Sequence, residues 1–390
     1  MPDIFISHQP LINRQNRILA NRLDLHLLNG ATPRDAAGAL QSLAEDWPAD
    51  EKPVFVNCGK TPWNKGLLAW SAPSNVTFEV PGAAFAAPDA ADLVSALQSA
   101  QPALCLMVDE HVQAAFSSGV AFRFIGLDAK RFSPSQMKTL AAQTQPHGIG
   151  VAFNVSDRQG FQDCLDAGLN AAASWFFKQA GTSGKAISPG QAQIIRIINL
   201  VRKNADVKEV EIALKQDVTL SYKLLRYINS AGFGLSCEIQ SFRHAVTILG
   251  YDKLNKWLSL LLATASKDPM AQAQMHTALY RARLMEILGQ GLVDANEYDN
   301  LFITGAFSML EALLGLSMDK VLETMSLPET ICDALLGRGG VYGPFLDLAI
   351  ACEGEDGEAI ATQAGLLGLS ADTFNQAQMK ALSFAEAIHI

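Results

Sequence analysis

The segment "RILANRLDLHLL", Arg17 to Leu28, carries the pattern from which the fold of the N-terminal half can be built. Its dense apolar content over about ten residues predicts a buried β-strand. Other short apolar runs of strand length surround it in the first 178 residues: "DIFIS", "PVFVNCG", "VTFEV", "ALCLMVDE", "FRFIGLD", "GIGVAFN" and "AAASWFF". Together with the opening segment they predict eight strands.

Helical patterns separate these strands. Thr32 followed by Pro33 predicts a capped helix start, because a hydroxyl accepts an orphan backbone N–H and proline suits the first helical position. Asp89, Ser133 and Ser156 are expected to cap three further helices in the same way. Strand and helix in alternation predict a parallel sheet with flanking helices. Eight strands would close a barrel, but a TIM barrel usually takes about 250 residues. We therefore expect a shortened TIM-like (β/α) barrel, with an open doubly wound sheet as the alternative.

The composition changes after this region. "KQAGTSGKAISPG", Lys178 to Gly190, is rich in glycine, serine and lysine and predicts a linker. From Gln191 onward, apolar residues recur at helical spacing, as in "QAQIIRIINLVRK". The fold class expected is thus α/β plus all-α, with a barrel over 1–178, a linker over 179–190 and an all-helical domain over 191–390.

Bulk composition excludes several classes of function. A length of 390 residues favours two domains, and a net charge of -9 disfavours a nucleic-acid-binding surface. No run of about 18 apolar residues is present, so no membrane span is expected. The six cysteines are scattered without a CxxC pair, which predicts reduced thiols, no zinc site and a cytoplasmic location.

The helical half resembles an HDOD domain, a module related to the HD phosphohydrolases. The resemblance rests on "VEIALKQDVTLSYKLLRYINSAGF", Val210 to Phe233, and "IQSFRHAVTILGYDKLNKWLSLLLA", Ile239 to Ala263. It makes Asn229, Ser230 and His244 candidate motif positions. HD hydrolases bind metal through a His-Asp pair, whereas "FITGAFSML" here places Ser308 and Met309 at that position.

The N-terminal half looks like an EAL domain, the barrel of cyclic di-GMP phosphodiesterases. "SHQPLINRQNRILANRLDL", Ser7 to Leu25, resembles the opening of that family, and an EAL domain followed by an HDOD domain is an architecture of bacterial signalling proteins. The family holds two divalent cations with carboxylates and an asparagine. The resemblance places Arg22 where the signature has a glutamate and Gly126 where it has a lysine.

A vestigial pocket is therefore expected at the ends of the strands. Its candidate residues are Arg22, Asn57, Glu79, Asp109 and Asp128. An arginine cannot ligate a cation, and its permanent charge repels one. We accordingly expect no metal, no cofactor and no catalytic residue.

These losses predict a non-catalytic signal-transduction protein, not an enzyme, that acts by binding another signalling or regulatory protein. No nucleic acid and no membrane partner is expected. Two alternatives stay open. One is a sensor that binds cyclic di-GMP without hydrolysis, with Arg22 or Arg123 contacting a phosphate. The other is a residual cyclic di-GMP phosphodiesterase.

Overall fold

The computed structural model describes residues 3–48, 52–59, 61, 63–178, 187–216, 242–264, 270–325 and 327–388. Contacts divide the chain into two compact units. One comprises Met1–Phe177 with Ile350–Met379, and the other comprises Lys178–Ala349 with Lys380–Ile390. The division into domains over 1–178 and 191–390 stays a prediction. The contacts add Ile350–Met379 to the unit that contains the strands.

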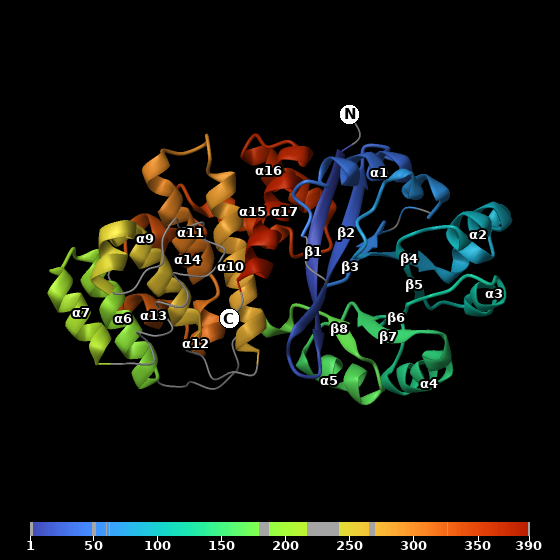
Figure 1. Cartoon of the computed structure of the whole chain (residues 1–390), viewed down its shortest axis with the longest axis horizontal. Coiled ribbons are helices and arrows are strands. Elements are labelled where there is room, and N and C mark those ends of the chain that lie inside the picture. Colours follow the sequence, from blue (N-terminus) through green and yellow to red (C-terminus); the bar gives the residue numbers. More distant parts are fainter. Residues whose placement is uncertain are drawn as a thin grey trace. The chain divides into compact units, whose positions relative to one another are not determined.

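Eight strands form a closed barrel in chain order (Figure 1). The strands are β1 (Asp3–Asn13), β2 (Ile18–Leu28), β3 (Val54–Asn57), β4 (Val76–Pro81), β5 (Ala103–Met107), β6 (Phe124–Asp128), β7 (Ile149–Phe153) and β8 (Ala171–Ala173). Each lies within or overlaps one of the eight apolar runs. The expected barrel is confirmed, and the open doubly wound sheet is wrong.

The first strand departs from the expected parallel arrangement. β1 pairs antiparallel with β2, with Gln9 opposite Arg22, and antiparallel with β8. The strands from β2 to β8 are parallel to their neighbours. The short connection through Asn16, at a φ of 60°, makes β1 and β2 a hairpin. A strand–helix–strand alternation was therefore the wrong expectation for this pair, because four residues leave no room for a helix.

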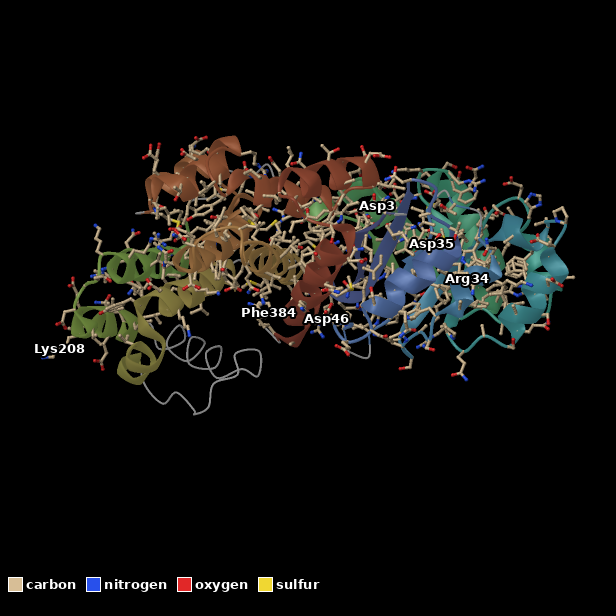
Figure 2. The ribbon with its side chains drawn as sticks, turned by 90° about the horizontal axis from the view of Figure 1, so that it is seen from above. Asp3, Arg34, Asp35, Asp46, Lys208 and Phe384 are labelled. Atoms are coloured by element: carbon tan, nitrogen blue, oxygen red, sulfur yellow. The ribbon has the colours of Figure 1, made fainter. Side chains whose placement is uncertain are left out.

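The expected helices cover the outside of the barrel as α1 (Pro33–Ser42), α2 (Ala90–Gln98), α4 (Pro134–Thr144) and α5 (Arg158–Asp166), and a short α3 (Val112–Ser117) is added. Thr32 and Ser133 cap α1 and α4 with reciprocal capping boxes. Figure 2 labels Asp35, the partner of Thr32, at the start of α1. Asp89 precedes α2 without a side-chain capping bond, and Asp157 rather than Ser156 caps α5.

The interior of the barrel is packed with side chains. Phe55 stands edge-on to Phe124 and Phe153, with ring centroids 4.9 and 5.8 Å apart. Leu11, Ala20, Cys105 and Val151 belong to the same buried cluster. This apolar layer closes the barrel from below, so any site must lie above it, at the carboxyl ends of β2 to β8.

A C-terminal segment completes the barrel unit. α16 (Gly357–Leu366) packs against β1 and β2, and the start of α17 (Ala371–Ala387) follows it (Figure 1). The Asn375 side chain donates to the Ile4 carbonyl at 2.7 Å and accepts from the Ile6 N–H at 3.1 Å. Gln378 donates to the Ile6 carbonyl at 2.8 Å. β1 pairs with β8 only at Leu11, Ile12 and Asn13. The side chains of Asn375 and Gln378 therefore bond backbone groups of β1 that have no partner on β8.

The second unit is helical. Its elements are α6 (Pro189–Arg202), α7 (Val207–Lys215), α9 (Phe242–Thr264), α10 (Ala271–Leu288), α11 (Tyr298–Phe307), α12 (Leu310–Leu314), α13 (Met318–Glu323), α14 (Glu329–Gly337), all but the last two residues of α15 (Gly343–Ala351), and the end of α17. Gly250 interrupts α9 with a φ of 74°, a backbone conformation that glycine adopts without the strain of a Cβ. Within the described residues, none of the helices is both long and apolar enough to span a bilayer.

Candidate functional site

A polar cavity of about 640 Å³ opens at the carboxyl ends of the barrel strands. Several strands contribute side chains to it, because inward-facing positions of the barrel converge there. The polar side chains that the strand ends contribute to its lining include Arg22, Asp24, Asn57, Glu79 and Asp128. Four of the five predicted pocket residues are therefore brought together, and Asp24 was missed by the sequence analysis.

Arg22 occupies the floor of this cavity. Its Nε donates to Glu79 Oε1 at 2.7 Å and its Nη2 to Glu79 Oε2 at 2.8 Å. Its Nη1 reaches Asp24 Oδ2 at 3.1 Å. The guanidinium also lies 4.6 Å from the centroid of the Phe153 ring. The bidentate pair and the aromatic contact fix the guanidinium in one orientation.

Both partners of this ion pair are removed from solvent. The side chains of Arg22 and Glu79 are 5% and 1% exposed. Burial by itself lowers the pKa of Arg22, but the carboxylates of Asp24 and Glu79 outweigh it and raise the pKa, so the arginine stays charged. Burial raises the pKa of Glu79, and Arg22 opposes that rise. The pair is thus held together at the cost of desolvating two charges.

Asp24 and Asn57 extend the network towards the opening. Asn57 Nδ2 donates to Asp24 Oδ1 at 2.5 Å, and Asn57 Oδ1 accepts from the Gly59 N–H at 3.1 Å. The two oxygens of Asp24 therefore serve different donors, Arg22 on one side and Asn57 on the other. Asp128, at the end of β6, accepts the Lys130 N–H at 2.9 Å and otherwise faces the cavity.

Asp109 does not join this group. Its Oδ2 accepts from the Ala83 N–H at 2.8 Å and its Oδ1 from the His111 N–H at 2.8 Å. It is a loop-bracing residue outside the lining of the cavity, so its assignment to the pocket is not supported by its position. Gly126 does lie below the floor. A Cβ there would come within 2.4 Å of Met107 Sδ and 2.7 Å of a Phe153 ring carbon, so a larger residue would displace both side chains.

The C-terminal segment supplies one wall of the cavity. Glu355, Asp356 and Glu358 are among its lining residues. Glu355 is paired with Lys130 at 2.7 Å. Burial lowers the pKa of His26, which packs below this wall and shares a hydrogen bond of 2.8 Å with Ser7 Oγ. Among the described residues that line the cavity, one arginine thus faces six carboxylates: Asp24, Glu79, Asp128, Glu355, Asp356 and Glu358.

Gly357 sets how closely this wall approaches the barrel. A Cβ at Gly357 would lie 2.4 Å from His26 Cβ and 2.7 Å from His26 Cγ. We expect Gly357→Val to lower the free energy of unfolding by about 1–3 kcal/mol, because the wall must move outward. Gly365 lies in the same helix with open space around it, so Gly365→Ala is the matched control. The control is expected to be neutral or stabilising by up to about 1 kcal/mol. Equal effects of the two changes in urea denaturation would contradict the close contact.

The cation pair implied by the EAL resemblance does not fit this arrangement. Both oxygens of Glu79 and one of Asp24 accept from Arg22, and the other Asp24 oxygen accepts from Asn57. Within the part of the chain that is described, no three His, Cys, Asp or Glu side chains are grouped so as to hold a metal ion. A divalent cation needs such oxygens free.

The candidate positions of the helical unit are less informative. Asn229 and Ser230 lie outside the described residues. His244 lies on α9, and its side chain is likewise outside the description. Ser308 ends α11, where its hydroxyl accepts from Arg281 at 2.8 Å and donates to the Gly305 carbonyl at 2.7 Å. It therefore joins α11 to α10.

Parts of this chain are similar to known proteins. Residues 189–308 match the HDOD domain. The chain is 28% identical over 241 residues to the cyclic di-GMP phosphodiesterase CdgJ of Vibrio cholerae, a match that covers 61% of this chain and 56% of that protein. It is 25% identical over 206 residues to the uncharacterized protein YuxH of Bacillus subtilis, covering 51% and 50%. The chain spans about half the length of these curated relatives.

Solved structures are also similar to part of this chain. The EAL domain of Mycobacterium smegmatis DcpA is 12% identical with a TM-score of 0.35, covering 44% of this chain and 90% of that one. The FimX EAL domain from Pseudomonas aeruginosa bound to c-di-GMP is 15% identical with a TM-score of 0.34, covering 45% and 89%.

One expectation is corrected by these comparisons. The lost motif residues led to the prediction that the chain is not an enzyme, and a relative that is named a phosphodiesterase contradicts it. The expected order of a closed barrel and a helical region that matches the HDOD domain is confirmed, and the chain is similar to a protein named a cyclic di-GMP phosphodiesterase. Residues 189–308 of this chain therefore match the HDOD domain, and they follow a closed eight-stranded barrel.

Proposed function

We propose that this chain is a cyclic di-GMP signalling protein whose barrel cavity binds the dinucleotide. The observation that carries the proposal is the polar cavity of about 640 Å³ at the carboxyl ends of the strands, a volume in the range of small-molecule sites. Similarity over 241 residues to a protein named a cyclic di-GMP phosphodiesterase supports it.

The chemistry of the lining is compatible with a guanine-containing ligand. Guanine presents N–H donors along one edge, and carboxylates accept them. Asp128, Asp356 and Glu358 line the cavity and supply such acceptors. Trp63 also lines it, and its indole N–H finds no acceptor among the described residues. The phosphates of the ligand would need compensating cations, because carboxylates outnumber the single arginine.

Calorimetry of the full chain with cyclic di-GMP tests the proposal. Titrations with and without Mg²⁺ are expected to give saturable heat in at least one condition. Asp128→Asn is expected to weaken binding about tenfold or more, the loss of a charge-assisted hydrogen bond. Asp166→Asn, on the outer helix α5, is the matched control and should bind as the unaltered chain does. An absence of heat in every condition would rule the proposal out.

The same samples decide whether binding leads to hydrolysis. Opening one phosphodiester bond releases the linear dinucleotide, which chromatography separates from the cyclic form. Its release would extend the activity named for the relative to this chain. Heat without release would indicate a binding function of the cavity.

We further propose that the helical unit passes the signal on by contact with another protein in the cytoplasm. A groove of about 460 Å³ runs beside α6, with Ile195 and Leu200 among its lining. Arg196 on α6 and Lys203, the residue that follows the end of α6, also line it, which suits an acidic partner segment with apolar anchors. The five described cysteines are all free, as a reducing compartment favours.

Charge reversal tests this contact. The Arg196→Glu, Lys203→Glu double variant is expected to lose any partner that co-purifies with the unaltered chain. Lys208 on α7 is exposed and lies outside the groove (Figure 2), so Lys208→Glu is the control and should retain the partner. Retention of the partner by the double variant would exclude the groove.

A further inference from the structure

Trp63 lines the barrel cavity and carries a hydrogen-bond donor without an acceptor. The residue is 8% exposed, and within the described part of the chain its Nε1 has no hydrogen-bond partner. The side-chain donors of Arg22 and Asn57 at the floor are already bonded to carboxylates. Because buried polar groups are nearly always hydrogen-bonded, an unpartnered N–H on a cavity wall indicates a ligand that supplies the acceptor.

The Trp63 ring is held in place by a buried aromatic ring and by a capped turn. It stands edge-on to Phe78 of β4, with the ring centroids 6.2 Å apart and the planes at 79°. The next residue, Asn64, accepts the Gly66 N–H at 2.8 Å and begins η1 (Lys65–Ala69). These contacts fix the indole before any ligand binds, so little side-chain freedom is lost on binding.

We propose that Trp63 selects guanine over adenine by donating its indole N–H to O6 of the base. This inference rests on the proposed function, because it takes a base of cyclic di-GMP as the occupant of the cavity. Guanine presents the O6 acceptor where adenine presents its N6 amino group, which is a donor. Trp63 thus gains a hydrogen bond with guanine, whereas with adenine two donors face each other.

A neutral carbonyl oxygen suits this cavity better than a phosphate oxygen does. Among its described lining residues, six carboxylates face one arginine, and they repel the negative charge of a phosphate. The guanine O6 carries no net charge. The amino group on the same base is a donor, which the carboxylates of Asp356 and Glu358 on the C-terminal wall can accept. The lining therefore offers both kinds of partner that guanine needs.

Trp70 provides a matched control in the same protein. It is 4% exposed, and its Nε1 also lacks a hydrogen-bond partner among the residues that the structure describes. Its ring lies edge-on to the same Phe78, with the centroids 6.1 Å apart, but Trp70 does not line the cavity. Trp63→Phe and Trp70→Phe therefore each remove one unpartnered indole N–H beside Phe78, and only the first removes it from the cavity.

Calorimetry of the full chain with cyclic di-GMP and cyclic di-AMP tests the proposal. The unaltered chain is expected to bind cyclic di-GMP at least about tenfold more tightly than cyclic di-AMP. Trp63→Phe should weaken binding of cyclic di-GMP about tenfold and change that of cyclic di-AMP less than about twofold, since only guanine loses a hydrogen bond. Trp70→Phe should keep both affinities.

Nuclear magnetic resonance observes the donor itself. The indole N–H resonance of Trp63, assigned by its absence in Trp63→Phe, is expected to move downfield when cyclic di-GMP is added, because the proton enters a hydrogen bond. The resonance of Trp70, assigned in the same way, should keep its position. A merely structural role of Trp63 would leave its resonance unmoved by the ligand.

The outcomes distinguish this inference from the proposed function. Equal weakening of cyclic di-GMP binding by Trp63→Phe and Trp70→Phe overturns the inference alone. Equal weakening of both dinucleotides by Trp63→Phe does so as well, because the donor would then contact a part that they share. Absence of binding of either dinucleotide overturns both proposals. If Trp63→Phe does not fold, the unaltered chain decides, since a bound ligand that moves no indole resonance excludes the contact.

Discussion

Replacement of Arg22 by methionine is expected to lower the free energy of unfolding of the barrel unit by about 3–5 kcal/mol. Methionine fills a similar volume but leaves Glu79 buried beside Asp24 without its bidentate partner. An uncompensated buried charge costs far more than the ion pair itself contributes, because the paired state had already lost its hydration. Urea denaturation followed by tryptophan fluorescence measures the change.

A double variant distinguishes the contribution of the ion pair to stability from the contribution of side-chain packing. Arg22→Met with Glu79→Leu removes both charges and is expected to recover most of the loss, since a buried pair replaced by apolar groups is often neutral. Arg34→Met is the control for a solvent-facing arginine of α1, which Figure 2 labels at the surface. Its effect should stay within about 0.5 kcal/mol. A loss below about 1 kcal/mol for Arg22→Met, or no recovery in the double variant, would contradict a buried charge pair.

Asn375→Ala is expected to cost about 2–5 kcal/mol. Its side chain bonds the Ile4 carbonyl and the Ile6 N–H, and it is 1% exposed. The alanine variant leaves both backbone groups of β1 buried without a partner, at about 1–3 kcal/mol each. Urea denaturation gives the total effect. Hydrogen exchange at the Ile6 amide measures the local effect, and the exchange rate should rise in the variant.

Gln376→Ala is the matched control for this change. Gln376 is the next residue of α17 and is only half-buried, so its loss should change the free energy of unfolding by less than about 0.5 kcal/mol. Similar effects of the two alanine variants would show that Asn375 contributes only as a helical residue. Unchanged exchange at Ile6 would show the same.

The strands of the barrel could be predicted from the sequence because each is a short apolar run bounded by turn or cap residues. The hairpin of β1 and β2 was not predicted, although four residues with an asparagine between two strand patterns are a recognisable signal. The packing of α16 and α17 on β1 could not be predicted. Asn375 and Gln378 are polar residues of a helix, and nothing in their neighbours indicates a strand edge hundreds of residues earlier.

The candidate site was predicted in part for a similar reason. Strand ends and family positions located Arg22, Asn57, Glu79 and Asp128, which the structure brings to one cavity. Asp24 was missed because two inward positions of one strand, two residues apart, both reach the site. The pairing of Arg22 with Glu79 joins residues 57 positions apart, and only the closure of the barrel decides it. The acidic residues of the C-terminal wall could not be predicted, because no local sequence pattern links them to the strand ends.

The long sequence separation between β1 and the helix residues that cover it has a consequence during synthesis. Asn375, the partner of Ile6, is made 369 residues after it. At about 5–20 residues per second, the edge of β1 waits roughly 20–70 s for its cover. An unpaired strand edge invites pairing with other chains during that time. We therefore expect the exposed edge of β1 in a nascent chain to be prone to aggregation until Asn375 has been made.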